Sequence, residues 1–140
     1  MPRFLLVAGR KTGDSSTPRW PGGLGALVGE TGPEGTWISW RLASANNREL
    51  GRSARVFANV DACRESIVSL RAGAAQASSM VAMDYITGLW RWQLAIDSMT
   101  VAVSARAYQR ERECVDNLRQ FLSAAVVAYA LSEGPLPRLR

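Results

Sequence analysis

The stretches WISWRLA (residues 37–43) and LWRWQLAI (residues 89–96) are nearly the same sequence written twice. Both alternate apolar and polar side chains with a period of two, which is typical of a half-buried β-strand. We expect Trp40 and its counterpart Trp92 to face a core. The other residues expected on that face are Ile38, Leu42, Trp90 and Leu94. The residues expected on the opposite face are Ser39, Arg41, Arg91 and Gln93.

The similarity continues after these strands. Ser-Ala-Arg at residues 53–55 aligns with Ser-Ala-Arg at 104–106, Phe57 with Tyr108, and Cys63 with Cys114. The offset between the two copies falls from 52 to 51 residues, so one residue is deleted in the second copy. A change in length is best tolerated in a turn. We therefore predict turns near residues 45–48 and 97–100, followed by second strands near 49–56 and 101–107.

Helical periodicity follows each second strand. Apolar residues at spacings of three and four predict one helix in each copy, with stripes formed by Val60, Cys63, Ile67, Leu70 and Ala74 and by Cys114, Leu118, Phe121, Leu122 and Ala125. Asn59 is a good N-cap for the first helix, whereas Arg110 at the second is a poor one. Residues 78–87 are a further apolar segment, and residues 126–133 either form a strand or extend the second helix.

This arrangement resembles the YegP-like family of small bacterial domains of unknown function. The resemblance covers residues 37–123 and is carried by the aromatic alternating strands, the Ser-Ala-Arg-x-Phe/Tyr runs and the Cys-x-x-x-Ile/Leu runs. It implies an α+β fold in which two β(3)-α-β repeats share one antiparallel sheet. Both helices would lie on one face, related by a pseudo-twofold axis, with the terminal strands exchanged. Family members occur as tandem repeats or as dimers of single units. No activity, cofactor or catalytic residue comes with the resemblance.

The chain is expected to form a single domain over residues 1–140. The first repeat is 1–77, with a Gly/Pro-rich insertion at about 10–36, the second is 78–133, and 134–140 form a flexible tail. The insertion leaves two choices for the first strand. Either residues 4–8 form it and a long loop follows, or residues 26–30 form it and the N-terminus is an appendage. The first choice is our expectation.

Composition excludes several classes of function. The chain of 140 residues contains no histidine and two cysteines, so it holds no Ser-His-Asp or Cys-His constellation and too few soft ligands for a tetrahedral zinc site. No apolar run approaches the roughly 20 residues of a membrane span, and the apolar stretch at residues 4–8 is too short for a signal peptide. We expect a cytoplasmic protein that binds no cofactor and no membrane.

The net charge of +5 and a pI near 10.0 favour an anionic partner. Four arginines are candidate contacts for phosphate or nucleic acid on an open sheet face: Arg41, Arg55, Arg91 and Arg106. The alternative is a solvated face within an arginine-rich composition, in which only Lys11 is lysine. Arg19 and Trp20 are a candidate partner contact, or else Trp20 folds its loop back onto the domain.

Two further sets of residues have a functional and a structural interpretation. Trp37, Trp40, Trp90 and Trp92 could stack on bases, but Trp40 and Trp92 are expected in the core. Cys63 and Cys114 are expected to be buried thiols and not a disulfide. The glycine-rich run at residues 22–30 lacks the spacing of a phosphate-binding loop.

The sequence thus predicts a small non-enzymatic binding or structural module, either a monomer with internal pseudo-symmetry or a homodimer. The alternative is a nucleic-acid or polyanion binder that uses the arginine-bearing sheet face. The third hypothesis is an enzyme that uses carboxylates or the glycine-rich loop. No catalytic or metal-binding residue is predicted.

Overall fold

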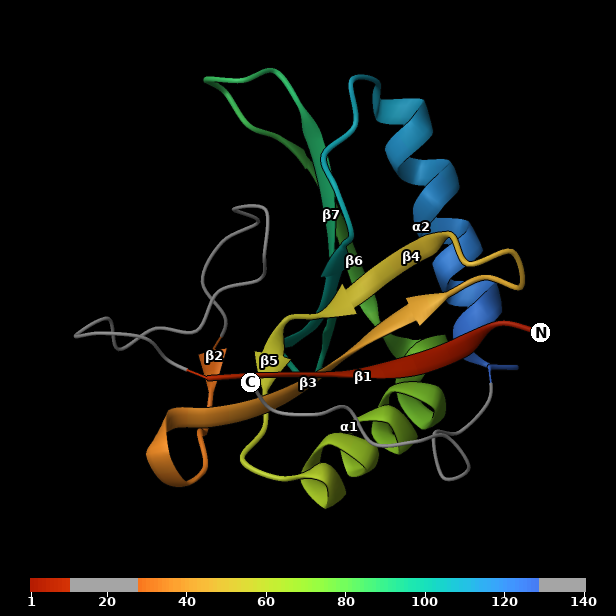
Figure 1. Ribbon diagram of the computed structural model, residues 1–140. Coiled ribbons are helices and arrows are strands. Elements are labelled where there is room, and N and C mark those ends of the chain that lie inside the picture. Colours follow the sequence, from red (N-terminus) through yellow and green to blue (C-terminus); the bar gives the residue numbers. More distant parts are fainter. Residues whose placement is uncertain (11–27, 129–140) are drawn as a thin grey trace.

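The computed structural model describes residues 1–10 and 28–128 (Figure 1). The elements are β1 (Arg3–Arg10), β2 (Val28–Gly29), β3 (Thr36–Ala43), β4 (Glu49–Ser53), β5 (Arg55–Val56), α1 (Val60–Gly73), β6 (Ser78–Met83), β7 (Trp90–Ile96), β8 (Met99–Ser104) and α2 (Glu111–Ala125). Two short 3-10 helices lie at Pro33–Gly35 and Ala74–Gln76. This order of elements confirms the α+β class.

Six strands form one antiparallel sheet in the order β1-β3-β4-β8-β7-β6. β1 pairs with β3 over its whole length, from Arg3 opposite Ala43 to Arg10 opposite Thr36. The first strand is therefore the N-terminal segment, as expected. The short β2 lies elsewhere and pairs in parallel with β5.

The β3–β4 and β7–β8 hairpins have the same pairing. Adding 52 to the residue number of the first partner and 51 to that of the second converts every residue pair of the β3–β4 hairpin into a residue pair of the β7–β8 hairpin. Arg41 opposite Arg52 thus corresponds to Gln93 opposite Val103. The register also shifts at equivalent points, Leu42/Ala43 and Leu94/Ala95. The two hairpins are therefore equivalent in register as well as in sequence pattern.

The one-residue deletion lies in the hairpin turns. Ala43 opposite Glu49 closes residues 44–48, whereas the equivalent pair Ala95 opposite Thr100 closes residues 96–99. Asp97 and Ser98 form the second turn with φ values of 51° and 66°. Two successive residues at positive φ are typical of a two-residue type I′ hairpin turn. Both predicted turns are confirmed.

The two halves meet where β4 lies beside β8. The three pairs there are Gly51–Ser104, Arg52–Val103 and Ser53–Ala102. When each residue is replaced by its equivalent in the other half, Arg52 and Val103 exchange places, and the Gly51–Ser104 pair becomes the Ser53–Ala102 pair. An approximate twofold axis therefore passes through the Arg52–Val103 pair.

β6 follows α1 in the chain but pairs with β7, in the second half of the sheet. Its counterpart under the exchange of halves is β1, which pairs with β3 at the other edge of the sheet. After α2, residues 126–128 form a turn. The remainder of the segment predicted as strand or helix, residues 129–133, lies outside the described residues, as does the predicted tail.

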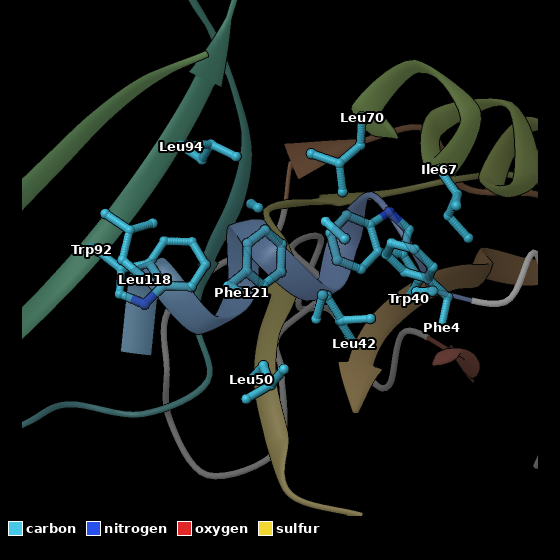
Figure 2. Packing of buried hydrophobic residues seen from close by; sticks show 14 of the residues in the cluster. Phe4, Trp40, Leu42, Leu50, Ile67, Leu70, Trp92, Leu94, Leu118 and Phe121 are labelled. Carbon is cyan, nitrogen blue, oxygen red and sulfur yellow. The ribbon is translucent and has the colours of Figure 1, made fainter. Parts of the chain in front are cut away.

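Both helices pack on one face of the sheet, because their buried residues join a single core cluster. At its centre the ring of Phe121 from α2 lies between Trp40 and Trp92 (Figure 2). The ring centroid of Phe121 is 4.8 Å from that of Trp92 and 6.3 Å from that of Trp40. Phe4 completes the row: its ring centroid is 5.2 Å from that of Trp40, and the two rings are perpendicular. The predicted core positions of Trp40 and Trp92 are confirmed.

Each core tryptophan donates a hydrogen bond to a polar residue on the helix above it. Trp40 Nε1–H donates to Ser66 Oγ at 3.1 Å, and Trp92 Nε1–H donates to Asn117 Oδ1 at 2.5 Å. Ser66 and Asn117 each follow a core cysteine by three residues, so the two bonds are equivalent. A buried indole N–H without a partner would be costly, and these bonds remove that cost.

The helix starts match the sequence. Asn59 Oδ1 accepts the backbone N–H of Ala62 at 2.8 Å, which confirms the N-cap of α1. Arg110 makes no side-chain cap bond at α2, where Glu111 and Glu113 supply negative charge in the first turn.

One residue expected to face solvent is buried. Ser39 lies on the sheet face away from the helices, yet it is fully buried. The bend between β4 and β5 places the Arg55 carbonyl beside it, and Ser39 Oγ donates to this oxygen at 2.7 Å. Next to it, Trp37 packs with Val56 of β5 and with Val7 in a small second cluster. One end of this face is therefore covered, which local alternation did not indicate.

Gly51 leaves the space that the central rings occupy. A Cβ atom there would lie 2.6 Å from Phe121 Cδ2 and 2.8 Å from Trp92 Cη2. We expect Gly51→Ala to lower the free energy of unfolding by about 1–3 kcal/mol, because the core would be overpacked. Urea denaturation measures this change.

Gly73→Ala is the matched control, because the nearest atom there is the flexible Cδ1 of Ile96 at 3.0 Å. It should leave the stability nearly unchanged. In a Phe121→Leu background the effect of Gly51→Ala should shrink, since the two positions are coupled. A Gly51→Ala protein as stable as the parent would contradict this account of the core.

Candidate functional site

We call the sheet face opposite α1 and α2 the outer face. One row of paired residues crosses all six strands on this face. From β1 to β6 the row consists of Leu5, Arg41, Arg52, Val103, Gln93 and Met80. Two arginines therefore stand side by side near the middle of the sheet.

Arg41 and Arg52 are directly opposite each other in the β3–β4 pair. Arg52 is held by Glu49, whose two carboxylate oxygens accept from its Nε and Nη2 at 2.9 and 3.0 Å. Arg41 is exposed and forms no ion pair with any residue that the structure describes. Like charges directly opposite on a sheet repel each other. Glu49 therefore pairs with one of the two neighbouring guanidinium groups, that of Arg52.

Arg91 extends the positive charge along β7. It lies opposite Ala82 and two residues before Gln93, so it shares the outer face. Its side chain is exposed. Asp84, at the start of the β6–β7 turn, has its pKa lowered chiefly by the backbone N–H groups of Thr87 and Ile86 and less by the charge of Arg91.

The other two candidate arginines lie away from the outer face. Arg55 is half-buried and lines a pocket beside α1, and Arg106 lines a pocket beside α2. The structure therefore brings Arg41 and Arg91 to one face with Arg52, and separates them from Arg55 and Arg106. Sequence pattern missed Arg52, because the register shift at Leu42/Ala43 obscures which face each β4 residue takes. The signal available was its alignment with Val103 across the two copies.

The four tryptophans considered for base stacking do not form an open surface. Trp40 and Trp92 are in the core, Trp37 is only 6% exposed, and Trp90 is half-buried against the core. Arg19 and Trp20, the candidate partner contact, lie outside the described residues, as do residues 22–27 of the glycine-rich run.

The α2 pocket has a volume of about 440 Å³ and is strongly charged. Its charged lining residues are Arg48, Glu49, Arg106, Glu113 and Asp116. The guanidinium carbon of Arg106 lies 5.0 Å from the centroid of the Tyr108 ring, a cation–π contact. Burial raises the pKa of Tyr108, which Arg106 partly opposes. Two of its carboxylates pair with arginines outside the lining, Glu49 with Arg52 and Asp116 with Arg119.

The α1 pocket has a volume of about 300 Å³ and is mainly apolar. It is the counterpart of the α2 pocket, because residues at equivalent positions of the two halves line the two pockets. Arg55 and Phe57 replace Arg106 and Tyr108. The hairpin of the opposite half contributes to each pocket, through residues 96–99 in one and 48–49 in the other. The fold thus builds two related pockets with different linings.

Cys63 and Cys114 are free buried thiols, as expected. Burial raises the pKa of Cys63 to about 12 and that of Cys114 to about 11. Arg64 opposes the first shift and Glu111 adds to the second. Since the thiolate is the reactive form, neither side chain is suited to act as a nucleophile near neutral pH.

Among residues 1–10 and 28–128, no group of three or more Cys, Asp or Glu side chains is arranged to hold a metal ion. Within the same ranges, no helix has the length and apolar character needed to cross a membrane.

The fold is that of a small α+β domain in which two hairpins of matching register lie around an approximate twofold axis. A similar solved structure is the solution NMR structure of a protein of unknown function, yegP from E. coli. It matches with a TM-score of 0.51 at 10% sequence identity, covering 81% of this chain and 91% of that chain. The fold is therefore YegP-like. At this identity the similarity concerns the fold alone. No protein-family model matches the sequence, and a search of curated proteins found no match.

The raised thiol pKa values make stability depend on alkaline pH. In the unfolded chain both thiols ionise near pH 9.0, whereas in the folded chain they hold their protons to about 12 and 11. This contribution to stability is complete below pH 9 and is lost as the pH rises toward 11–12. We expect the free energy of unfolding, measured in urea, to fall over this window.

A Cys63→Ala/Cys114→Ala variant should show a shallower fall, although it begins from a lower stability. At pH 8 an aromatic disulfide reagent should label both thiols in urea and neither in the native protein. Rapid labelling of the native protein would show that the thiols are not buried as described.

Proposed function

We propose that this chain is a non-enzymatic binding module that binds a phosphate-bearing polyanion, such as a nucleic-acid backbone, through its outer face. Arg41, Arg52 and Arg91 are the residues that would contact phosphate. Guanidinium groups suit this role, because their planar donors match phosphate oxygens in pairs.

The observation that carries the proposal is the direct opposition of Arg41 and Arg52. Two like charges on neighbouring strands are destabilising, and Glu49 binds only the second of them. An anion placed over the pair would relieve this repulsion. The net charge of +5 adds a long-range attraction for the same partner.

The contacts would be to the backbone of the polyanion and not to bases. Among the residues that the structure describes, Trp37 is the tryptophan on this face, and at 6% exposure it offers no open ring for a base to stack on. Phosphate contacts position a nucleic acid without reading its sequence. The proposed binding is therefore independent of sequence and strongly dependent on salt.

The non-enzymatic part of the proposal is supported by the inventory of reactive groups. The chain has no histidine, and both thiols have raised pKa values. The carboxylates of the α2 pocket are the remaining candidates for an enzyme. Those of Glu49 and Asp116 already face arginines, at Arg52 and Arg119. We place the module in the cytoplasm, where free thiols persist.

We also infer that residues 1–77 and 78–133 descend from one duplicated unit within a single domain. Support comes from the identical offsets of 52 and 51 in sequence and in strand pairing. A unit of this size buries a small share of its surface and would be only marginally stable alone.

Arg41→Gln tests the proposed polyanion site. Binding to a labelled DNA duplex, measured by fluorescence anisotropy at several salt concentrations, should weaken, and the slope of log K against log salt should fall by about 0.9 for the lost contact. A single-stranded oligonucleotide should show the same order of effects with smaller slopes.

Arg112→Gln is the matched control. It removes the same charge from an exposed position on α2, on the opposite side of the sheet. Its slope should stay at the parent value. Equal losses in the two variants would mean that net charge alone attracts DNA, and no binding at about 50 mM salt would exclude the proposal.

A further inference from the structure

The α1 pocket has features of a small-molecule site that is separate from the outer face. Its volume of about 300 Å³ lies at the lower end of the range for ligand sites. Its apolar wall comes from both halves of the chain: Trp40, Phe57 and Leu70 from the first, and Ile96, Met99 and Val101 from the second. Such a wall with a few convergent polar groups is the usual make-up of a ligand pocket.

Besides Ser69, the polar residues of the lining fall into two kinds. Ser53 and Ser66 are engaged internally: Ser53 Oγ donates to the Arg55 carbonyl at 2.9 Å, and Ser66 Oγ donates to the Cys63 carbonyl at 2.6 Å. Arg55 and Asp97 offer the charges of the pocket. Neither forms an ion pair with a residue that the structure describes. One positive and one negative group thus line the same apolar pocket without neutralising each other.

The backbone that carries Arg55 is held firmly. Its carbonyl accepts hydrogen bonds from Ser39 Oγ and Ser53 Oγ, and its N–H donates to Ser53 Oγ at 3.0 Å. Asp97 stands on the tight β7–β8 turn at a φ of 51°. Both charged residues are therefore placed by rigid main chain, which favours a preorganised site.

In the equivalent α2 pocket, the arginine has an aromatic partner that Arg55 lacks. There Arg106 stacks on Tyr108 and shares its pocket with three carboxylates. In the α1 pocket the aromatic residue is Phe57, which has no hydroxyl group. The same fold position thus holds an arginine stacked on a tyrosine ring in one half and an arginine without a described side-chain partner in the other.

We infer that the α1 pocket binds a free α-amino acid with a large apolar side chain. The ligand carboxylate would pair with Arg55, its ammonium group with Asp97, and its side chain would pack against Trp40 and Phe57. A zwitterion matches the two opposite charges, and the apolar wall accounts for the rest of the cavity. This inference is independent of the proposed polyanion binding.

Titration calorimetry of the full chain with L-phenylalanine and L-leucine tests the inference. Saturable binding is expected, and it should weaken at least tenfold in Arg55→Gln and in Asp97→Asn. Asparagine accepts positive φ readily, so Asp97→Asn should keep the turn intact. Arg106→Gln, the same change in the α2 pocket, should bind like the parent.

Two ligand analogues separate the charges. N-acetyl-L-phenylalanine lacks the ammonium group and phenethylamine lacks the carboxylate, so each should bind at least tenfold more weakly than L-phenylalanine. In ¹⁵N NMR spectra, L-phenylalanine should shift the indole N–H signal of Trp40, which lines the pocket, and leave that of Trp92 in place.

No saturable binding up to about 10 mM ligand, or equal binding by the parent and Arg55→Gln, would overturn the inference. Equal affinity for phenethylamine and L-phenylalanine would also overturn it, because the carboxylate would then play no part.

Discussion

The contact of Phe121 with both Trp40 and Trp92 is the interaction on which the rest of the structure depends. Each half of the sheet supplies one tryptophan, and α2 places one ring between them (Figure 2). Without this shared centre each half would be left with an exposed apolar face, and a unit of about 50 residues is at best marginally stable alone. Gly51 makes the approach possible, since any side chain there would occupy the space of the rings.

Equivalent pairing in the two halves has a chemical consequence. It builds a pocket beside each helix, with an arginine and an aromatic residue at corresponding positions. The two pockets then differ through single side chains. Arg106 stacks on Tyr108 in a pocket lined by carboxylates, whereas Phe57 and an apolar wall surround Arg55. A symmetric backbone therefore carries two chemically distinct sites.

The outer face follows from the placement of both helices on one side of the sheet. One end is covered by Trp37 and Val56, while the central row remains lined by arginine. Sequence alternation placed Arg41 and Arg91 on this face correctly, because a strand directs alternate side chains to opposite faces. Sequence alternation did not include Arg52, because a register shift breaks the alternation beside it. It also grouped Arg55 and Arg106 with Arg41 and Arg91, although Arg55 and Arg106 both follow bends.

The sequence by itself determined the two strand–turn–strand–helix units, the turns, the α1 cap and the core tryptophans. These features depend on neighbours close in the chain, whose periodicity is visible in one dimension. Only the tertiary structure decided that Asn117 accepts a hydrogen bond from Trp92 and that Ser39 is buried beside the Arg55 carbonyl. It also decided that each pocket is lined in part by the hairpin of the other half. Such contacts join residues far apart in the chain, so no local pattern records them.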